Sequence, residues 1–444
     1  MKIRISQNKL TLLVSLFFTV FFNATFFKRV LSVYPFNTHN FLFLSSLFIF
    51  LLFATNLIIS IFRGKKYFKG LLFVLFFLST MAAYVMDSYG TVIDETMILN
   101  VLKTDSHEMM DLLTFRLCLY LIFLFIIPTF LLYKTEITYH GFKRELSLKL
   151  QAIAASTIII FVMLFSQGKF YATFFREQKP LRYYTNPTYY IYSMGKFGSS
   201  LLKNPNRALQ ALGRDSIIPL HDLDRDLIIL VVGETARRDH FSLNGYSKET
   251  NPLLKKENVI SFTNVTSCGT STAISVPCMF SNFGRSNFNS DDFNSTENLL
   301  DVLTHTKDVN VLWRDNNSDS KGVAKRVKYE DFKTSASNTI CNPECRDVGM
   351  LVGLQEHIDS AKEQDIVIVL HQMGNHGPAY FKRYPKEFEV FKPVCQTSEL
   401  EKCSNEEISN AYDNAILYTD YFLSKTIDLL KRNSEKFSTA MIYV

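Results

Sequence analysis

The sequence predicts a protein of two parts, a membrane domain of five helices followed by an α/β domain with a largely parallel sheet. Apolar residues make up 47% of the 444 positions, and they are concentrated in the first 166, where Phe and Leu dominate. The remainder has the mixed composition of a globular fold, with short apolar runs that each lead directly into polar residues. Six of the seven cysteines also fall in this second part, as close pairs. Paired cysteines are typical of an oxidising compartment.

The membrane domain is predicted from hydropathy. A helix needs roughly 20 mostly apolar residues to cross a bilayer. Five runs approach or exceed this length: 10–27, 41–62, 70–87, 117–133 and 150–166. A basic segment precedes the first run, but no small-residue cleavage site follows it, so we expect this run to remain as an anchor. Residues 1–166 are therefore predicted to form a transmembrane domain of five helices.

The basic residues of the loops predict the orientation. Lys and Arg gather at the N-terminus, in the 63–69 turn and in the 134–149 loop, whereas the alternate loops carry few of them. Loops rich in Lys and Arg remain in the cytoplasm. Five crossings then place everything after residue 166 outside the cytoplasm, which in a bacterium is the periplasm at the inner membrane. The paired cysteines independently favour the same side.

Residues 167–220 are predicted to be a linker that lies on the membrane surface. Aromatic rings mixed with cations suit the headgroup layer, and this stretch is rich in both. They are Phe170, Tyr171, Phe174, Phe175, Tyr183, Tyr184, Tyr189, Tyr190 and Tyr192, with Lys169, Arg176, Lys179 and Arg182. An ordinary exposed linker is the alternative.

Charge and cysteine spacing exclude some classes of partner and site. The formal charge of +6 is small for this length and includes no basic block that could neutralise a row of phosphates, so no nucleic-acid partner is expected. We predict disulfides among the paired cysteines rather than zinc clusters, because no His or second pair accompanies them at zinc-finger spacing. The paired residues are Cys268, Cys278, Cys341, Cys345, Cys395 and Cys403, and Cys118 stands alone in an apolar run.

Residues 221–444 are predicted to form the α/β domain. Four apolar runs have the length of buried strands: Leu227–Val232, Val309–Trp313, Ile366–Leu370 and Ala440–Val444. Helix-like or loop segments separate them, which is typical of parallel strands. A ligand site in such a fold forms at the carboxyl ends of the strands.

Polar residues follow the first two strands. Glu234 follows the first strand after Gly233, where a metal ligand could lie, although a Glu at a strand end is more often a helix cap or a surface charge. Thr272 belongs to a hydroxyl-rich turn that opens a short helix, and the positive end of a helix favours an alkoxide or a bound phosphate; a plain N-cap is the alternative. Asn317 and Lys321 follow the second strand in a segment suited to gripping phosphate oxygens, or simply to a polar surface loop.

The third strand leads into a loop that carries two histidines, His371 and His376, around Gly374. Two histidines in a flexible loop at a strand end are harder to explain by packing alone. We therefore expect this loop to have a function.

Five segments of the second half together resemble the lipid A phosphoethanolamine transferases, including the mobile colistin-resistance enzymes. They occur in order behind the five predicted spans, and the resemblance covers essentially the whole chain. The segments are Val231–Arg237 with Asp239–Tyr246, Cys268–Cys278, Asn316–Lys321, His376–Pro378 and Tyr412–Asp420. The resemblance implies a catalytic domain of the alkaline phosphatase and sulfatase type.

The resemblance also implies roles for individual residues. Thr272 would be the nucleophile that takes phosphoethanolamine from phosphatidylethanolamine and passes it to a phosphate of lipid A. Glu234 would bind zinc, with Thr272 also on the metal, and the metal would make the hydroxyl a better nucleophile. Asn317, Lys321 and His376 would contact the transferred group. Resistance to polymyxins would follow from the reduced negative charge of lipid A.

One feature departs from the family pattern. The family carries an Asp-His zinc pair in a Ser-Asp-His-Gly-Glu motif just after a strand like Ala440–Val444, and a further His beyond it, whereas the sequence stops at Val444. Glu234 and Thr272 are only two of the three or four ligands that zinc requires. The expectation is that the 444-residue polypeptide binds zinc weakly and is inactive, while the full-length gene product is active.

Other functions remain open at this point. A related enzyme could act on another acceptor, such as a core sugar of lipopolysaccharide or another glycan, or could transfer glycerol phosphate. A protein of a different class would be a membrane anchor or partner-binding protein without chemistry. In that case Thr272→Ala would change nothing.

Overall fold

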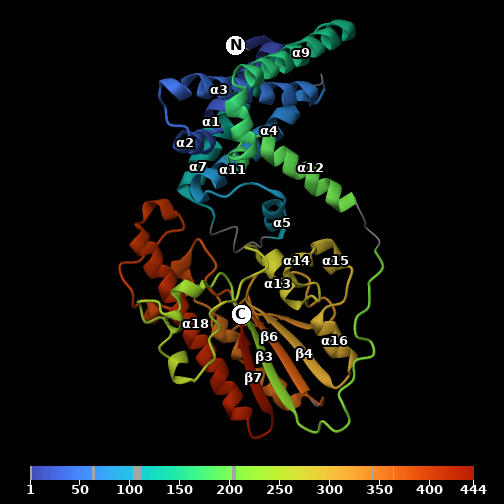
Figure 1. The fold of residues 1–444 in the computed structure, drawn as a ribbon, viewed down its shortest axis with the longest axis vertical. Coiled ribbons are helices and arrows are strands. Elements are labelled where there is room, and N and C mark those ends of the chain that lie inside the picture. Colours follow the sequence, from blue (N-terminus) through green and yellow to red (C-terminus); the bar gives the residue numbers. More distant parts are fainter. Residues whose placement is uncertain (1–2, 63–65, 104–111, 203–206, 343, 364) are drawn as a thin grey trace. The chain divides into compact units, whose positions relative to one another are not determined.

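The computed structural model describes the whole chain except residues 1–2, 63–65, 104–111, 203–206, 343 and 364. The described residues form two compact units: the first is drawn from Met1–Leu102 and Leu113–Pro205, and the second from Lys103–Leu112 and Asn206–Val444. Figure 1 shows the helical character of the first unit and the sheet of the second.

The first unit is built of apolar helices. Four of them are long and apolar enough to cross a membrane, at Thr38–Phe62, Phe68–Tyr89, Phe115–Lys134 and Phe142–Ser166, and a bent pair makes a fifth if it counts as one span. The helices are α1 (Gln7–Phe21), α2 (Ala24–Val33), α3 (Thr38–Phe62), α4 (Phe68–Tyr89), α5 (Glu95–Lys103), α7 (Phe115–Tyr120), α8 (Ile127–Lys134) and α9 (Phe142–Ser166). A π-helical turn at Leu121–Ile126 joins α7 to α8, and two short parallel strands, β1 (Ile3–Ser6) and β2 (Thr135–Thr138), pair with each other.

The first predicted span, 10–27, is not one straight helix. Helices α1 and α2 meet at an angle of 57°. Asn23 lies at the break, and its side-chain amide donates to the carbonyl oxygens of Phe18 at 2.9 Å and Asn186 at 2.7 Å. A side chain that inserts into the backbone hydrogen-bond ladder is a common cause of a helix kink.

The predicted linker, 167–220, contains three helices: α10 (Gly168–Arg176), α11 (Lys179–Arg182) and α12 (Thr188–Leu202). Tyr171 and Phe174 of α10 are only 2% and 3% exposed, because they pack with Phe43 and Leu47 of α3. Part of this segment is therefore packed against the apolar helices. Its position on a membrane surface stays a prediction.

The second unit contains a five-stranded sheet with the order β5-β4-β6-β3-β7. Its strands are β3 (Asp226–Val232), β4 (Val309–Asp315), β5 (Lys328–Asp331), β6 (Asp365–His371) and β7 (Ser438–Tyr443). All four pairings are parallel. The predicted parallel sheet is confirmed, and β5 is a strand that the sequence did not predict.

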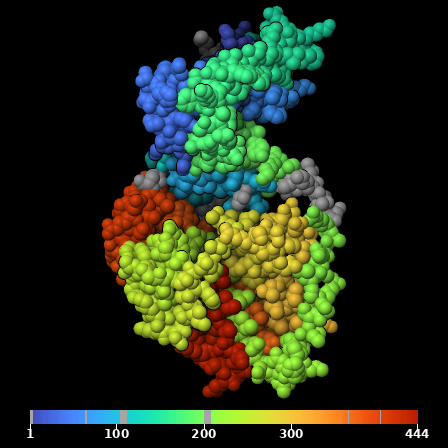
Figure 2. All heavy atoms as spheres, in the orientation of Figure 1, coloured from blue at the N-terminus to red at the C-terminus, as the bar shows by residue number. Residues whose placement is uncertain are grey.

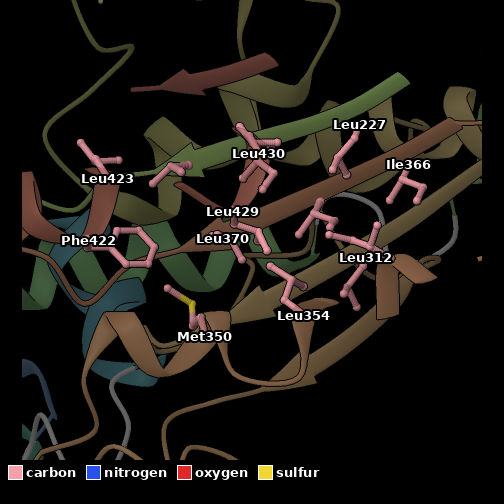
Figure 3. Close-up of a cluster of buried hydrophobic side chains, with 14 of the residues drawn as sticks. Leu227, Leu312, Met350, Leu354, Ile366, Leu370, Phe422, Leu423, Leu429 and Leu430 are labelled. Atoms are coloured by element: carbon pink, nitrogen blue, oxygen red, sulfur yellow. The ribbon is translucent and has the colours of Figure 1, made fainter. Parts of the chain in front are cut away.

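Apolar side chains cover both faces of this sheet. Ile366, Ile368 and Leu370 of β6 pack on one face with residues of α18 (Asn405–Asn433) such as Phe422 and Leu430 (Figure 3). Val367 and Val369 point to the other face, where they pack with side chains of α13 (Thr272–Phe280), α15 (Ser290–Asn294) and α16 (Leu299–His305). The remaining helices of this unit are α14 (Gly284–Asn287) and α17 (Leu354–Ser360).

The interior strands are buried on both sides, which explains why they read as continuous apolar runs. On these interior strands, polar side chains therefore gather mainly at the strand ends and in the loops beyond them. Two of the segments that follow β3, coloured yellow-green and yellow, are seen at the surface of this unit in Figure 2.

Candidate active site

The end of β3 presents a carboxylate at the edge of the sheet. Glu234 is two residues beyond Val232 and is 9% exposed. Gly233 allows β7 to approach, because a Cβ atom at this position would lie 2.7 Å from the Tyr443 hydroxyl. A larger residue at position 233 would therefore clash with the Tyr443 ring.

Thr272 is the first residue of α13, and its hydroxyl donates to Glu234 Oε2 over 2.9 Å. A disulfide between Cys268 and Cys278 ties the turn before this helix to the helix itself. The positive end of the α13 dipole lies at its N-terminus. The Thr272 hydroxyl thus lies beside the Glu234 carboxylate and at the N-terminus of α13, where negative charge is favoured.

Asn317, in the loop after β4, bonds to the same Glu234 oxygen as Thr272. It is 1% exposed, and its amide nitrogen donates to Glu234 Oε2 at 3.3 Å and to the carbonyl oxygen of Gln372 at 2.9 Å. One carboxylate oxygen therefore receives hydrogen bonds from both Thr272 and Asn317. The structure brings together these three residues, which the sequence had singled out separately.

Lys321 lies in the same loop as Asn317 and is buried, with 8% exposure. Its ammonium donates to the Ser318 hydroxyl and is 3.5 Å from Asp319 Oδ1. Its backbone has φ +51°, which is unusual for a residue with a side chain and indicates a tightly specified turn. A buried cation is therefore held in place beside the strand ends.

The loop after β6 approaches Glu234 through its backbone. Asn375 N–H donates to the Glu234 carbonyl oxygen over 3.0 Å. A Cβ atom on Gly374 would lie 2.9 Å from that same oxygen, so this close approach requires glycine. His376 follows directly, and its carbonyl oxygen accepts a hydrogen bond from Arg383 Nε at 2.6 Å. The loop thus brings His376 to the same edge of the sheet, although its contact with a substrate stays a prediction.

Asp347 joins two of these loops and was not predicted from the sequence. Its carboxylate accepts hydrogen bonds from Asn316 Nδ2 at 2.8 Å, Met373 N at 2.8 Å and Gly374 N at 3.0 Å. Burial raises the pKa of Asp347, and these donors oppose the shift. Asp347 lies outside every strand, so no local pattern in the sequence marked it.

Three disulfides form within this unit, in the pairs that the sequence predicts. They are Cys268–Cys278, Cys341–Cys345 and Cys395–Cys403. The second lies directly before Asp347, and the Cys345 carbonyl oxygen accepts from Asn316 Nδ2 over 3.1 Å. This disulfide therefore supports the loop that carries Asn317.

His371, which the sequence marked as a candidate, is the last residue of β6 and is fully buried. Its Nδ1 is 3.0 Å from Oδ2 of Asp315, the last residue of β4. Burial alone would lower the pKa of His371, but the Asp315 carboxylate raises it above its ordinary value. The sequence did not single out Asp315, although its place at a strand end could have done so.

The described residues contain no group of three or more His, Cys, Asp or Glu side chains close enough to hold a metal ion. Glu234 Oε2 and Thr272 Oγ1, 2.9 Å apart, are nevertheless two oxygen donors directed at each other. Zinc accepts oxygen ligands of this kind. This pair therefore fits two positions of a zinc site.

Comparisons with known proteins show which family the chain resembles. A family model described as Sulfatase matches residues 226–444, and one described as Phosphoethanolamine transferase EptA/EptB matches residues 51–201. Phosphatidylethanolamine transferase Mcr-2 of Escherichia coli is 41% identical, over 97% of this chain and 82% of the relative. The chain belongs to the phosphoethanolamine transferase family.

Two further members of the phosphoethanolamine transferase family extend the comparison. Phosphoethanolamine transferase EptA of Escherichia coli K12 is 34% identical over 98% of this chain and 80% of its own length. The solved structure of the integral membrane protein lipooligosaccharide phosphoethanolamine transferase A (EptA) from Neisseria meningitidis matches with a TM-score of 0.94 and 30% identity, covering 99% of this chain and 82% of that one. The predicted family and fold class are confirmed, and this chain is a membrane-bound phosphoethanolamine transferase.

Proposed function

We propose that this transferase takes phosphoethanolamine from phosphatidylethanolamine through Thr272 and passes it to a phosphate of lipid A, in the periplasm at the bacterial inner membrane. The observation that carries the proposal is the 2.9 Å hydrogen bond from the Thr272 hydroxyl to Glu234 at the carboxyl end of a parallel sheet. A hydroxyl becomes an effective nucleophile when a neighbouring group accepts its proton.

The reaction would proceed in two displacements at phosphorus. Thr272 Oγ1 forms a bond to the phosphorus of phosphatidylethanolamine as its proton moves toward Glu234 Oε2. The bond from phosphorus to the diacylglycerol oxygen breaks, and that oxygen takes the proton from Glu234 and leaves as diacylglycerol. A phosphate oxygen of lipid A then attacks the same phosphorus as the proton of this phosphate moves to Glu234. The bond from phosphorus to Thr272 Oγ1 breaks, and Oγ1 takes that proton from Glu234.

Zinc belongs to this proposal, with Glu234 and Thr272 as two of its ligands. When bound, the metal would favour the deprotonated hydroxyl and neutralise negative charge on the phosphoryl oxygens. The chain itself supplies the orientation, because Asn317 Nδ2 fixes the same Glu234 oxygen that faces Thr272.

Asn317, Lys321 and His376 are proposed to contact the transferred phosphoryl group. Lys321 supports this role because it is a buried cation, and its ammonium has hydroxyl and carboxylate partners within the same loop. A positive charge held near transferring phosphoryl oxygens stabilises the charge that develops there. Asn317 shares that loop, and His376 lies in the loop that contacts the Glu234 backbone.

Lipid A is the proposed acceptor. The structural relative from Neisseria meningitidis is named as acting on lipooligosaccharide, which is a glycolipid acceptor. Phosphoethanolamine on lipid A would place a cationic amine beside the phosphate and weaken the binding of cationic peptides, so polymyxin resistance is the expected phenotype. A sugar of lipopolysaccharide or another glycan is the alternative acceptor.

Mass analysis of lipid A from cells that express the complete gene product tests the proposal. We expect lipid A with an added phosphoethanolamine on a phosphate, and none with Thr272→Ala. Ser281→Ala is a matched control, because the Ser281 hydroxyl donates to the Cys278 carbonyl oxygen, at 2.9 Å, near the opposite end of α13. Phosphoethanolamine on a sugar alone would identify the alternative acceptor. Modification that survives Thr272→Ala would contradict the proposed nucleophile.

A further inference from the structure

A buried ion pair lies at the ends of two neighbouring interior strands and is hydrogen-bonded to the backbone of Asn317. Asp315 ends β4 and His371 ends β6, and the two are partners in the register of these neighbouring strands. Both side chains are 0% exposed, and His371 Nδ1 is 3.0 Å from Asp315 Oδ2. His371 Nε2 is buried and, within the described part of the chain, has no hydrogen-bond partner. The orientation of the imidazole therefore depends on Asp315.

Asp315 uses both carboxylate oxygens. Oδ2 accepts hydrogen bonds from His371 and from Trp313 Nε1, the latter at 2.8 Å. Oδ1 accepts from the backbone N–H of Asn317 at 2.8 Å. The ion pair thus holds the backbone of the residue whose side chain reaches Glu234.

A continuous path of hydrogen bonds leads from this pair to the nucleophile. Asp315 holds the Asn317 backbone at 2.8 Å, and the Asn317 side chain donates to Glu234 Oε2 at 3.3 Å. The same oxygen accepts from Thr272 Oγ1 at 2.9 Å. A displacement of Asn317 would therefore shift Glu234 Oε2, the oxygen that receives the Thr272 proton.

Stability alone is a weak reason for such a pair. Removing two charges from water costs several kcal/mol for each ion, and replacing a buried pair by apolar residues is often neutral or stabilising. The apolar core continues on both faces of the same strands, so apolar residues would fit the surroundings. A role in placing Asn317 accounts for both the charges and the position of the pair.

We infer that Asp315 and His371 are positioning residues of the transferase, which fix Asn317 and through it the Glu234 carboxylate that faces Thr272. This inference rests on the proposed role of Thr272. Neither residue is proposed to touch the substrate.

Three substitutions separate this role from simple packing. Asp315→Asn keeps the volume and one acceptor oxygen but removes the charge that holds His371. His371→Asn keeps a nitrogen donor at the position of Nδ1, whereas His371→Leu removes it. Asp420→Asn is the matched control, because Asp420 is also 0% exposed and accepts the N–H groups of Leu253 and Leu254, at 2.9 and 3.0 Å, instead of site residues.

The first measurement is hydrogen–deuterium exchange of the peptide that contains Asn317, in the complete gene product. Its N–H is bonded to Asp315, so we expect Asp315→Asn to speed its exchange about tenfold, the change that corresponds to about 1.4 kcal/mol. Asp420→Asn should leave this peptide unchanged. This readout needs no turnover.

The second measurement is the rate at which Thr272 acquires phosphoethanolamine in a single turnover with phosphatidylethanolamine. Loss of a supporting hydrogen-bond partner lowers activity by about 10- to 100-fold in comparable sites. We expect this loss with Asp315→Asn and His371→Leu, with the donor-lipid concentration that gives half the maximal rate nearly unchanged. His371→Asn should recover most of the rate, and Asp420→Asn should retain all of it.

Three results would overturn the inference: unchanged exchange at Asn317 in Asp315→Asn, faster exchange without a slower rate, or an equal loss of rate in Asp420→Asn. Wild-type protein that never acquires phosphoethanolamine on Thr272 would instead contradict the proposed function. In that case the exchange measurement still decides whether Asp315 holds Asn317.

Discussion

Helix α1 of the first unit and the strand ends of the second unit satisfy buried polar groups in opposite ways. In α1 the hydroxyls of Thr11, Ser15 and Thr19 each donate to the carbonyl oxygen four residues earlier, at 2.8 to 2.9 Å. At the strand ends, Thr272 bonds to Glu234 and Asp315 bonds to His371, across 38 and 56 residues of sequence. A buried hydroxyl satisfied by its own helix needs no further explanation. Buried carboxylates that meet a hydroxyl and an imidazole at the carboxyl ends of parallel strands indicate a functional site.

The strongest test of this contrast is Glu234→Gln. The substitution keeps the size of the side chain but removes the charge that receives the Thr272 proton. General base catalysis contributes about 10²- to 10⁴-fold, so we expect the rate of phosphoethanolamine transfer by the complete gene product to fall by that factor. Glu363→Gln is the control. Glu363 accepts a hydrogen bond from Asn310 Nδ2 at 3.1 Å near the amino ends of β4 and β6, away from the site. A wild-type rate with Glu234→Gln would exclude the carboxylate from the chemistry.

A smaller effect is expected at Asp420, a buried carboxylate of the second unit outside the site. Burial raises the pKa of Asp420 to about 6, against the opposing effect of the Leu254 and Leu253 N–H groups. Because the folded pKa exceeds that of an exposed Asp, the unfolded chain holds fewer protons between about pH 4 and pH 6. The stabilisation is therefore fully present below about pH 4 and is lost as the pH rises to about 6, by at most about 3 kcal/mol.

Thermal unfolding of the complete gene product across this pH range measures that effect. The unfolding temperature of the wild type should fall with rising pH relative to Asp420→Asn, which cannot titrate at this position. Equal slopes for the two proteins would show that the pKa of Asp420 is the same in the folded and the unfolded chain.

The smallest effect is expected in the first unit, for Ser15→Ala. The lost hydrogen bond is local, and side-chain hydrogen bonds between membrane helices contribute only about 0.6 kcal/mol on average. We expect a transfer rate within twofold of the wild type and a shift of a few degrees at most in the unfolding temperature. Thr272→Ala removes a single hydroxyl as well, so the pair compares local with convergent hydrogen bonding directly. A tenfold loss of rate with Ser15→Ala would contradict this difference between the local hydrogen bonds of α1 and those of the site.

Sequence reasoning located the four longer strands to within a few residues. Three of them, β3, β4 and β6, are interior strands and are therefore largely apolar. The fourth, β7, has exposed or half-buried residues but still contains a short apolar run. It missed β5 (Lys328–Asp331), whose four residues include three charges and whose side chains are half-buried or exposed. It also treated residues 10–27 as one span. The break at Asn23 depends on the distant carbonyl of Asn186, which no local pattern reveals.

The same reasoning identified Glu234, Thr272 and Asn317 separately, as polar residues near strand or helix ends, and the structure joins them by hydrogen bonds. Their proximity followed from the rule that parallel strands end at one edge of the sheet. Asp315 and Asp347 were missed because their importance depends on which distant groups they meet. Asp347, for example, bonds to backbone groups 26 and 27 residues away.

The central claim is that Thr272 carries the phosphoethanolamine between donor and acceptor. Its most direct test is mass analysis of the peptide containing Thr272, after the complete gene product is mixed with phosphatidylethanolamine in the absence of lipid A. The account predicts one phosphoethanolamine on Thr272, and its loss when lipid A is added. An unmodified peptide, or modification of the neighbouring Thr270 or Ser271 instead, would contradict it.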